Sequence, residues 1–343
     1  MRLLVTGGAG FVGANVAVAL KGRHPDWEVA ALDNLYRRGS ELNLDRLRAA
    51  GVRFVHGDVR QRADVEAAGP FTAMVECSAE PSVMAHGDVL VPVNLLGAHN
   101  CFEVARTHGA QVLFLSTSRV YPVAGLEALP YRETETRFEL TDRGGVDEAF
   151  PLLPGPRTVY GATKLAAELL IAEYAVGYGL RATVNRCGVL AGPWQMGKVD
   201  QGVFTHWLLS HRLGLPLRYI GYGGVGKQVR DLVHVEDAVD LIEMQLLDPD
   251  HWAGRTFNAG GGRAGSLSLL ETTQLCREIT GREVPVDPEP EGRPGDVRIY
   301  VTDAAAVEAH SGWRPRRTPR QVLEDTHAWI GEHEPLVRSA LGL

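Results

Sequence analysis

Several features are scarce or absent in this sequence, and each absence excludes a class of protein. The four cysteines form no CxxC pair, so we expect reduced thiols rather than a disulfide scaffold. No run approaches the ~18 apolar residues that span a bilayer. The first residues carry no charged leader followed by an apolar stretch, so they do not resemble a signal peptide. We therefore expect a cytoplasmic protein without a membrane partner.

Positive charge is also scarce. The 343 residues include 42 acidic and 35 basic side chains, which gives a formal net charge of −7. Nucleic-acid binding relies on Lys and Arg to neutralise phosphates, so this balance argues against a nucleic-acid partner. Hydrophobic residues make up 45% and charged residues 22% of the chain. Such values are typical of a globular enzyme and exclude wholesale disorder, a coiled coil or a fibre.

Short apolar runs alternate with longer amphipathic stretches through the first 190 residues. Apolar runs without polar alternation suit strands that are buried on both faces, and their alternation with helices indicates a parallel sheet. We therefore expect a doubly wound α/β domain. The clearest predicted helices are 89–108 and 158–178. The predicted strands are 3–5, 29–32, 53–55, 73–75, 112–115 and 181–184.

The pattern changes after Gly192, where glycine and proline become frequent and strand-like runs such as 217–220 stand alone. This change predicts a smaller second domain. The segment 231–247 has a helical pattern and is expected to return to the first domain, whereas 284–297 is expected to be a loop. The predicted division assigns 1–190 and 229–250 to the first domain, and 191–228 and 251–343 to the second. The basic cluster expected on the solvated surface consists of Arg314, Arg316, Arg317 and Arg320.

One connection within the first domain is unusually long. Residues 122–157 hold five prolines, four glycines and no clear periodicity. Long connections in compact domains are usually functional or mobile. Because this one lies between two segments with candidate catalytic residues, we expect it to cover a substrate. A disordered surface excursion is the alternative.

A glycine-rich turn follows the first predicted strand. Its spacing is Gly7-x-x-Gly10-x-x-Gly13, and Phe11 and Val12 open the helical pattern that follows. Glycines allow a tight turn and let backbone N–H groups approach a pyrophosphate at a helix N-terminus. The turn therefore predicts a dinucleotide-binding site.

An acidic residue stands where such a site binds its adenosine ribose. Asp33, followed by Asn34, ends the second predicted strand 20 residues after Gly13. A carboxylate there accepts hydrogen bonds from ribose hydroxyls and repels a 2′-phosphate. This favours NAD over NADP, although Arg37 and Arg38 would favour the phosphate.

Two further pairs follow the third and fourth predicted strands, namely Asp58-Val59 and Ser78-Ala79. In doubly wound sheets, ligands lie beyond the carboxyl ends of the strands. We therefore expect these four residues to flank the adenine and a ribose of the dinucleotide.

Tyr160 and Lys164 stand four residues apart, on one face of a predicted helix. An ordinary tyrosine, with a pKa of about 10, is a poor base at pH 7. A nearby ammonium and a cationic nicotinamide ring favour the phenolate, which would exchange a proton with a sugar hydroxyl during hydride transfer. Thr117, in Ser116-Thr117 after the fifth strand, would hydrogen-bond the same oxygen. Taken alone, the Tyr–Lys pair would more simply be explained by an ordinary surface helix.

Together these motifs resemble the extended short-chain dehydrogenase/reductase family, and within it the nucleotide-sugar epimerases and dehydratases. The resemblance runs over nearly the whole chain. It includes Asn94 in Val-Asn-Leu-Leu-Gly, Arg230 in Val-Arg-Asp-Leu-Val-His-Val, Arg293 in Arg-Pro-Gly-Asp, and the late Gly-Trp-x-Pro at 312–315.

The resemblance implies a Rossmann-type domain that holds NAD and a smaller C-terminal α/β domain that holds a nucleotide diphospho-sugar. It implies a homodimer and no metal. The implied catalytic residues are Thr117, Tyr160 and Lys164, and Asn94 and Ser116 join the cofactor site. Arg230 and Arg293 match positions that hold the diphosphate or its ribose, and Arg298 is a weaker candidate.

Departures from the family pattern bear on the reaction. In the related dTDP-glucose 4,6-dehydratases, Asp-Glu follows the catalytic threonine, whereas this chain has Ser118 and Arg119. Arginine cannot act as an acid or base, so dehydration is disfavoured. Val189 replaces an Asn of many UDP-sugar epimerases, which disfavours UDP-galactose-type recognition. Asp200-Gln201-Gly202 and the segment 226–231 resemble CDP-paratose (CDP-tyvelose) 2-epimerases.

The resemblance thus implies epimerisation at C2 of a CDP-hexose through a transient ketosugar, with retained NAD. A nucleotide-sugar 4-epimerase, a 4,6-dehydratase and a reductase that exchanges its cofactor remain alternatives. An NAD-binding sensor or scaffold would not need Thr117, Tyr160 and Lys164 together. The side chains expected at the substrate are Glu80, Ser82, Ser118, Arg119 and Gln201, together with the three arginines named above.

Overall fold

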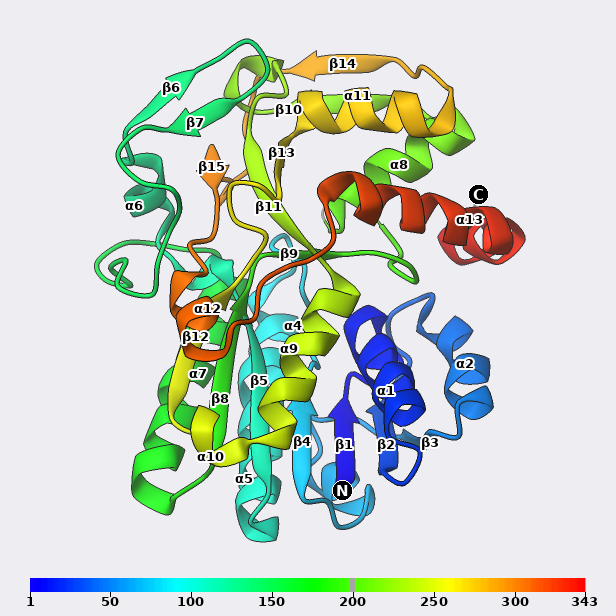
Figure 1. Ribbon diagram of the computed structural model, residues 1–343, viewed down its shortest axis with the longest axis vertical. Coiled ribbons are helices and arrows are strands. Elements are labelled where there is room, and N and C mark those ends of the chain that lie inside the picture. The colour runs from blue at the N-terminus through cyan, green and yellow to red at the C-terminus, as the bar shows by residue number, and fades with distance from the viewer. Residues whose placement is uncertain (198–200, 343) are drawn as a thin grey trace.

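The computed structural model describes residues 1–197 and 201–342. Its centre is a seven-stranded sheet in which all neighbouring strands run parallel (Figure 1). The order reverses between β1 and β4, as in a doubly wound Rossmann-type fold, and this confirms the predicted fold class. In spatial order the strands are β12 (Arg255–Ala259), β8 (Ala182–Cys187), β5 (Gln111–Thr117), β4 (Ala73–Glu76), β1 (Arg2–Thr6), β2 (Glu28–Asp33) and β3 (Arg53–His56).

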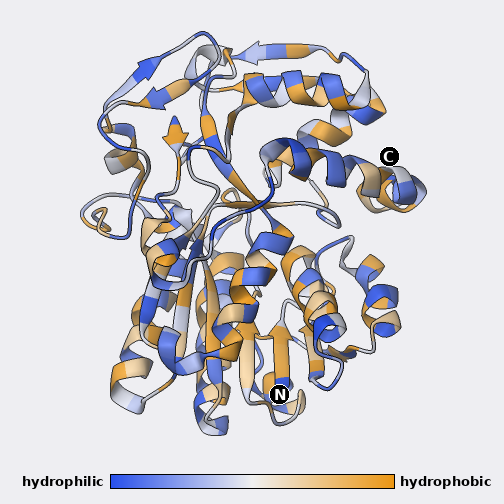
Figure 2. Ribbon diagram, in the orientation of Figure 1, coloured by the Kyte–Doolittle hydropathy of each residue, from blue (hydrophilic) through white to orange (hydrophobic). Residues whose placement is uncertain are grey.

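Helices cover both faces of this sheet, and the strand side chains alternate between the two cores. Leu4 packs in a buried cluster with Phe102, whereas its neighbour Leu3 packs in another with Ile242. The central strands of the sheet are accordingly mostly apolar (Figure 2). The first core lies under α3 (Arg62–Ala67), α5 (Gly97–His108) and α7 (Val159–Tyr178). The second lies under α1 (Phe11–Arg23), α2 (Asn43–Ala49) and α9 (Val235–Leu247).

The two long helices predicted from the sequence are present. The first is a continuous helical segment made of α4 (Gly87–Leu90), a π-helical stretch η2 (Val91–Leu96) and α5. Short 3₁₀ helices are η1 (Ser40–Leu42), η3 (Ser118–Val120) and η4 (Tyr222–Gly224). Helices α10 (Pro249–Trp252) and α12 (Ala305–Ser311) lie beside β12 at the sheet edge (Figure 1).

A smaller α/β part lies beyond the carboxyl ends of the large sheet (Figure 1). Its strand β11 (Val229–His234) pairs with β9 (Val189–Ala191), β13 (Ser266–Ser268) and β15 (Ile299–Tyr300). Strand β10 (Leu217–Ile220) pairs with β14 (Val286–Glu289), so the segment 284–297 is not entirely a loop. The helices of this part are α8 (Val203–Leu213), α11 (Leu269–Thr280) and α13 (Pro319–Leu341).

The predicted boundaries need two corrections, and both arise from strand pairing over long sequence distances. The first four residues of the expected helix 231–247 belong to β11, and α9 begins only at Val235. Residues 255–259 were assigned to the second domain but form β12, which pairs with β8 at the edge of the large sheet. The remainder of the two-domain division stays a prediction.

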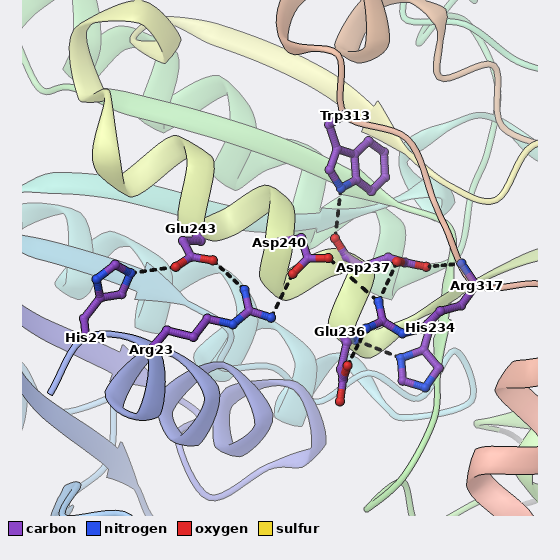
Figure 3. A network of polar contacts seen from close by, with 9 residues as sticks. All are labelled: Arg23, His24, His234, Glu236, Asp237, Asp240, Glu243, Trp313 and Arg317. Atoms are coloured by element: carbon purple, nitrogen blue, oxygen red, sulfur yellow. Dashed lines mark hydrogen bonds and ion pairs between the residues drawn. The ribbon is translucent and has the colours of Figure 1, made fainter.

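Ion pairs connect α9 to α1 and to the segment before α13 (Figure 3). Arg23 on α1 lies 2.8 Å from Asp240, and Arg317 lies 2.7 Å from Asp237, whose side chain is buried. The expectation that Arg317 is simply solvated is therefore wrong, because three acidic side chains of α9 form ion pairs with it. The rest of the basic cluster is exposed, namely Arg314, Arg316 and Arg320.

The long connection 122–157 is more ordered than its sequence indicates. It contains α6 (Val123–Glu127) and a hairpin of β6 (Tyr131–Glu133) and β7 (Phe138–Leu140). Backbone hydrogen bonds tie it to the smaller part, for example from the N–H of Val146 to the carbonyl of Val301 at 2.7 Å. Within the described part of the chain, no helix is both long and apolar enough to cross a membrane.

Candidate functional site

A cavity of about 500 Å³ lies beyond the carboxyl ends of β1, β2, β4 and β5, where the strand order reverses. This is where doubly wound sheets bind ligands. No described residue of 122–157 lines it, so the substrate-covering role of that connection stays a prediction. The predicted site residues that line it are Gly7, Gly10, Phe11, Val12, Gly13, Asp33, Asn34, Asp58, Val59, Ser78, Ala79, Glu80, Ser116, Thr117, Ser118, Arg119, Tyr160, Lys164 and Gln201.

The glycine turn between β1 and α1 is tightly packed on itself. Gly7 has φ +60°, and its carbonyl accepts a hydrogen bond from the N–H of Gly10 at 2.9 Å. A Cβ atom at Gly13 would lie only 2.2 Å from the Gly7 carbonyl oxygen. Helix α1 begins at Phe11 without a side-chain cap, so its first N–H groups are available to an anion. The turn therefore fits the phosphates of a dinucleotide.

Asp33 at the end of β2 is held by the same turn. Its carboxylate accepts hydrogen bonds from the N–H of Ala9 at 3.1 Å and of Leu35 at 2.8 Å. Burial raises the pKa of Asp33, while these hydrogen bonds lower it. Because the carboxylate also lines the cavity, it is placed to accept hydrogen bonds from a ribose.

Two further polar contacts organise the adenosine side of the cavity. Asn34 donates a hydrogen bond to Asp58 at 2.9 Å, and the Arg60 guanidinium beside Asp58 lowers the pKa of that carboxyl to about 2. Arg37 donates a hydrogen bond to Gln201, so the loop after β2 contacts the segment before α8. Asp200, quoted in the family resemblance, lies outside the described residues.

Helix α7 brings Tyr160 against the end of β5. The Thr158 hydroxyl caps the helix by accepting a hydrogen bond from the N–H of Gly161 at 3.2 Å. A Cβ at Gly161 would lie 2.0 Å from the carbonyl oxygen of Arg119, so glycine at this position allows the close approach. The Thr117 side chain thereby lies close enough to Tyr160 to lower the pKa of its phenol.

The electrostatics of Tyr160 differ from the sequence-based expectation. Burial raises its pKa to about 12, while the hydrogen bond from Thr117 and the charge of Arg119 lower it. A depressed pKa was expected from Lys164 and a cationic nicotinamide ring. Among the described side chains, desolvation outweighs the charge of Arg119.

Lys164 lies one turn further along α7 and is only 2% exposed. Its ammonium lies 4.0 Å from the centre of the Phe114 ring and 3.8 Å from the carboxylate of Glu76. The sequence analysis missed Glu76. The sequence does contain a signal for it. Glu76 is a carboxylate at the end of the otherwise apolar strand 73–76, and this strand ends at the sheet edge that binds ligands.

Some predicted site residues form hydrogen bonds to other protein groups, which indicates that they hold the site in shape. The Ser116 hydroxyl donates a hydrogen bond to Glu168, which forms a buried ion pair with Arg186 at 2.8 Å. Buried Asn94 lies outside the cavity lining and binds both backbone groups of Glu80, at 2.8 and 3.0 Å. Ser82 also lies outside the lining.

The predicted arginines are not all brought together. Arg119 lines the large cavity, and its Nη1 donates to the carbonyl of Gly295 at 2.8 Å. Arg230 lines a separate cavity of about 40 Å³ next to Arg119 and pairs with Asp296 at 2.5 Å. Arg293 and Arg298 line neither of these cavities.

Arg298 has an ion pair of its own, with Glu127 at 3.3 Å. Its guanidinium also stacks over the ring of Tyr131 at 4.3 Å. Among the described residues, no group of three or more His, Cys, Asp or Glu side chains is arranged to hold a metal ion.

Comparisons with known proteins agree with this geometry. The sequence pattern of the NAD dependent epimerase/dehydratase family matches residues 3–260. The CDP-paratose 2-epimerase of Salmonella typhi is 30% identical, over 96% of this chain and 99% of that protein.

Two solved structures are similar over nearly their whole length. The UDP-glucose 4-epimerase of Thermus thermophilus, in complex with NAD, has a TM-score of 0.79 and 28% identity, over 96% of this chain and 99% of that one. A double mutant of the dTDP-glucose 4,6-dehydratase of Streptomyces venezuelae, with NAD bound, has a TM-score of 0.81 and 29% identity, over 99% of this chain and 100% of that one.

These relatives differ in reaction but share the architecture from which the cavity is built. Their similarity to this chain is nearly equal, so it identifies the family rather than the reaction. The family match covers the large sheet, the glycine turn and the helix that carries Tyr160 and Lys164. It confirms both the family resemblance of the motifs and NAD as the family's cofactor. This chain belongs to the NAD dependent epimerase/dehydratase family.

Proposed function

We propose that this protein epimerises C2 of a CDP-hexose through a transient 2-ketosugar and keeps NAD bound throughout the cycle. The observation that carries the proposal is the meeting of Thr117 and Tyr160 at the cavity, with Lys164 one turn along the same helix. The similarity to CDP-paratose 2-epimerase over 96% of the chain supports the choice of substrate. A sensor or scaffold would not require this trio.

NAD would be held by the glycine turn, the start of α1 and Asp33, whose geometry is described above. The glycine turn and the start of α1 would bind the pyrophosphate, and Asp33 would bind the adenosine ribose. When bound, NAD accepts a hydride from the sugar and returns it, and its cationic ring favours the Tyr160 phenolate.

Tyr160 is the proposed acid and base. It would take the proton of the C2 hydroxyl as the C2–H bond breaks, which leaves a ketone at C2. After the ketosugar has turned its other face, Tyr160 would return the proton to the same oxygen. The side chain of Thr117 lies beside Tyr160 and would hold that oxygen in place.

Arg119 supports epimerisation over dehydration. It occupies the position at which the related dehydratases carry an acid, and it lines the cavity. It forms no ion pair with a carboxylate among the described residues, and its charge lowers the pKa of Tyr160. A fixed cation there would stabilise negative charge on a sugar oxygen but would not transfer the protons that loss of water requires.

We further propose a cytoplasmic homodimer. Leu169 and Val176 on α7 and Leu96 on η2 are 64%, 86% and 52% exposed. Burying these apolar side chains against a second copy would be favourable. The four cysteines are unpaired, which suits a reducing compartment.

Proton NMR with a panel of nucleotide sugars and no added cofactor tests the proposed function. With CDP-paratose we expect a new anomeric signal whose coupling indicates inversion at C2, and no reaction with the UDP- and dTDP-hexoses. Conversion of a UDP-hexose to its C4 epimer would replace the proposal with a 4-epimerase. Formation of a 4-keto-6-deoxy sugar would replace it with a 4,6-dehydratase.

A further inference from the structure

Lys164 is a buried cation that needs a source of stabilisation. Its side chain is 2% exposed and is surrounded by the Phe114 ring and by the strands of the sheet. Burial disfavours the charged form and lowers the pKa of Lys164. An opposite charge close to the ammonium would favour its protonated form.

Glu76 is the carboxylate placed to supply that charge. It is fully buried at the end of β4. Its Oε1 accepts hydrogen bonds from the N–H of Ser78 at 3.1 Å and the hydroxyl of Thr6 at 3.4 Å. Its Oε2 has no hydrogen-bond partner among the described residues and lies 3.8 Å from Nζ of Lys164. One oxygen therefore anchors the side chain, and the other faces the ammonium.

We propose that Glu76 is a positioning residue of the epimerase, whose carboxylate keeps the Lys164 ammonium charged and in place on the helix face that carries Tyr160. This inference rests on the proposed function. Glu76 is not among the residues that line the cavity, so it would act through Lys164 rather than on the substrate.

The other ionisable groups around Lys164 do not replace Glu76. Glu168 is nearby on α7 but forms a bidentate pair with Arg186. The neighbouring thiols remain neutral because burial raises their pKa values; they are Cys77, Cys101 and Cys187. Around Tyr160 the charged groups are Arg119, which lowers its pKa, and Glu76, which raises it.

The test follows the charge of Lys164 directly and needs no substrate. The sequence contains four lysines, so NMR of protein labelled with [¹³Cε]lysine gives few signals, and Lys164→Met assigns the relevant one. We expect Glu76→Gln to lower the titration midpoint of Lys164 by at least about one pH unit. The matched control Glu103→Gln, on α5 and paired with Arg106, should leave the midpoint unchanged.

An unchanged midpoint in folded Glu76→Gln protein would overturn the inference. Should that variant not fold, Glu76→Asp keeps the charge but moves it about one methylene away. It should lower the midpoint by a smaller amount, and an unchanged midpoint would again overturn the inference.

The pH profile of turnover provides the functional readout. Removing the carboxylate makes both Lys164 and Tyr160 lose their protons at lower pH, so both limbs of the Glu76→Gln profile should move to lower pH. Glu76→Asp should restore them in part. A purely structural defect would reduce the rate without moving either limb. If no sugar is converted, the proposed function fails by itself, whereas the NMR midpoint still decides the role of Glu76.

Discussion

Gly13 packs directly on the carbonyl of Gly7, because a Cβ atom at Gly13 would lie 2.2 Å from that oxygen. Gly13→Ala must therefore push apart the turn that is proposed to bind the pyrophosphate. We expect this variant to lose its bound NAD and about 1–3 kcal/mol of unfolding free energy. The nucleotide released on denaturation and urea unfolding measure the two effects.

Gly22→Ala is the matched control on the same helix. Nothing lies within 4 Å of a Cβ atom at Gly22, so this variant should keep its NAD. It should also gain up to about 1 kcal/mol from helix propensity. Equal NAD content in the Gly13 variant, the Gly22 variant and the wild type would contradict the proposed phosphate site.

Asp33→Asn tests the proposed ribose contact. The amide oxygen can still accept one hydrogen bond from the turn, but the negative charge is lost. We expect NAD affinity to fall by about 10-fold or more and the discrimination against NADP to weaken, since no carboxylate then repels a 2′-phosphate. Calorimetric titration with both cofactors measures this, and Asp45→Asn on the exposed face of α2 serves as a control. Unchanged selectivity would show that Asp33 does not contact the ribose.

Tyr160→Phe removes the proposed acid and base and little else. We expect turnover to fall by about 10²–10⁴-fold, with the NAD content and the unfolding midpoint of the purified protein preserved. Tyr178→Phe, at the exposed end of the same helix, should leave turnover unchanged. Turnover of Tyr160→Phe within a factor of two of wild type would exclude the proposed role.

Arg186→Met tests the buried ion pair between Arg186 on β8 and Glu168 on α7. It leaves the Glu168 carboxylate buried without its partner, and removing one member of such a pair costs about 3–5 kcal/mol. Arg48→Met, which breaks an exposed pair with Asp45, should change the unfolding free energy by less than about 0.5 kcal/mol. If both variants lose the same unfolding free energy in urea, the buried pair of Arg186 contributes no more to stability than the exposed pair of Arg48.

Local sequence signals were sufficient for six of the seven strands of the large sheet and for many of the residues that line the cavity. Apolar runs such as 73–75 are stable when they are buried between two helical layers. The residues that follow each strand therefore lie at the carboxyl edge of the sheet, where ligands bind. Glu76 was missed because one charge at the end of an apolar run gives no indication of a partner 88 residues away in Lys164.

Other features depend on contacts that local patterns do not reveal. The start of 231–247 has a helical pattern, yet 231–234 form a strand because two distant strands, β13 and β9, pair with this segment. In the sequence, Arg317 has the pattern of a solvated cation, but in the fold it forms an ion pair with Asp237 of α9. The pKa of Tyr160 rises because burial outweighs the charge of Arg119. A sequence motif does not show how deeply its residues are buried.

The most direct test of the account uses CDP-paratose that carries deuterium at C2, incubated with the purified protein in ordinary water without added cofactor. If a hydride leaves C2 and returns to its opposite face on retained NAD, the product is inverted at C2 and keeps its deuterium there. Loss of deuterium to water, inversion at C4 with C2 unchanged, or a requirement for added NAD would contradict the account.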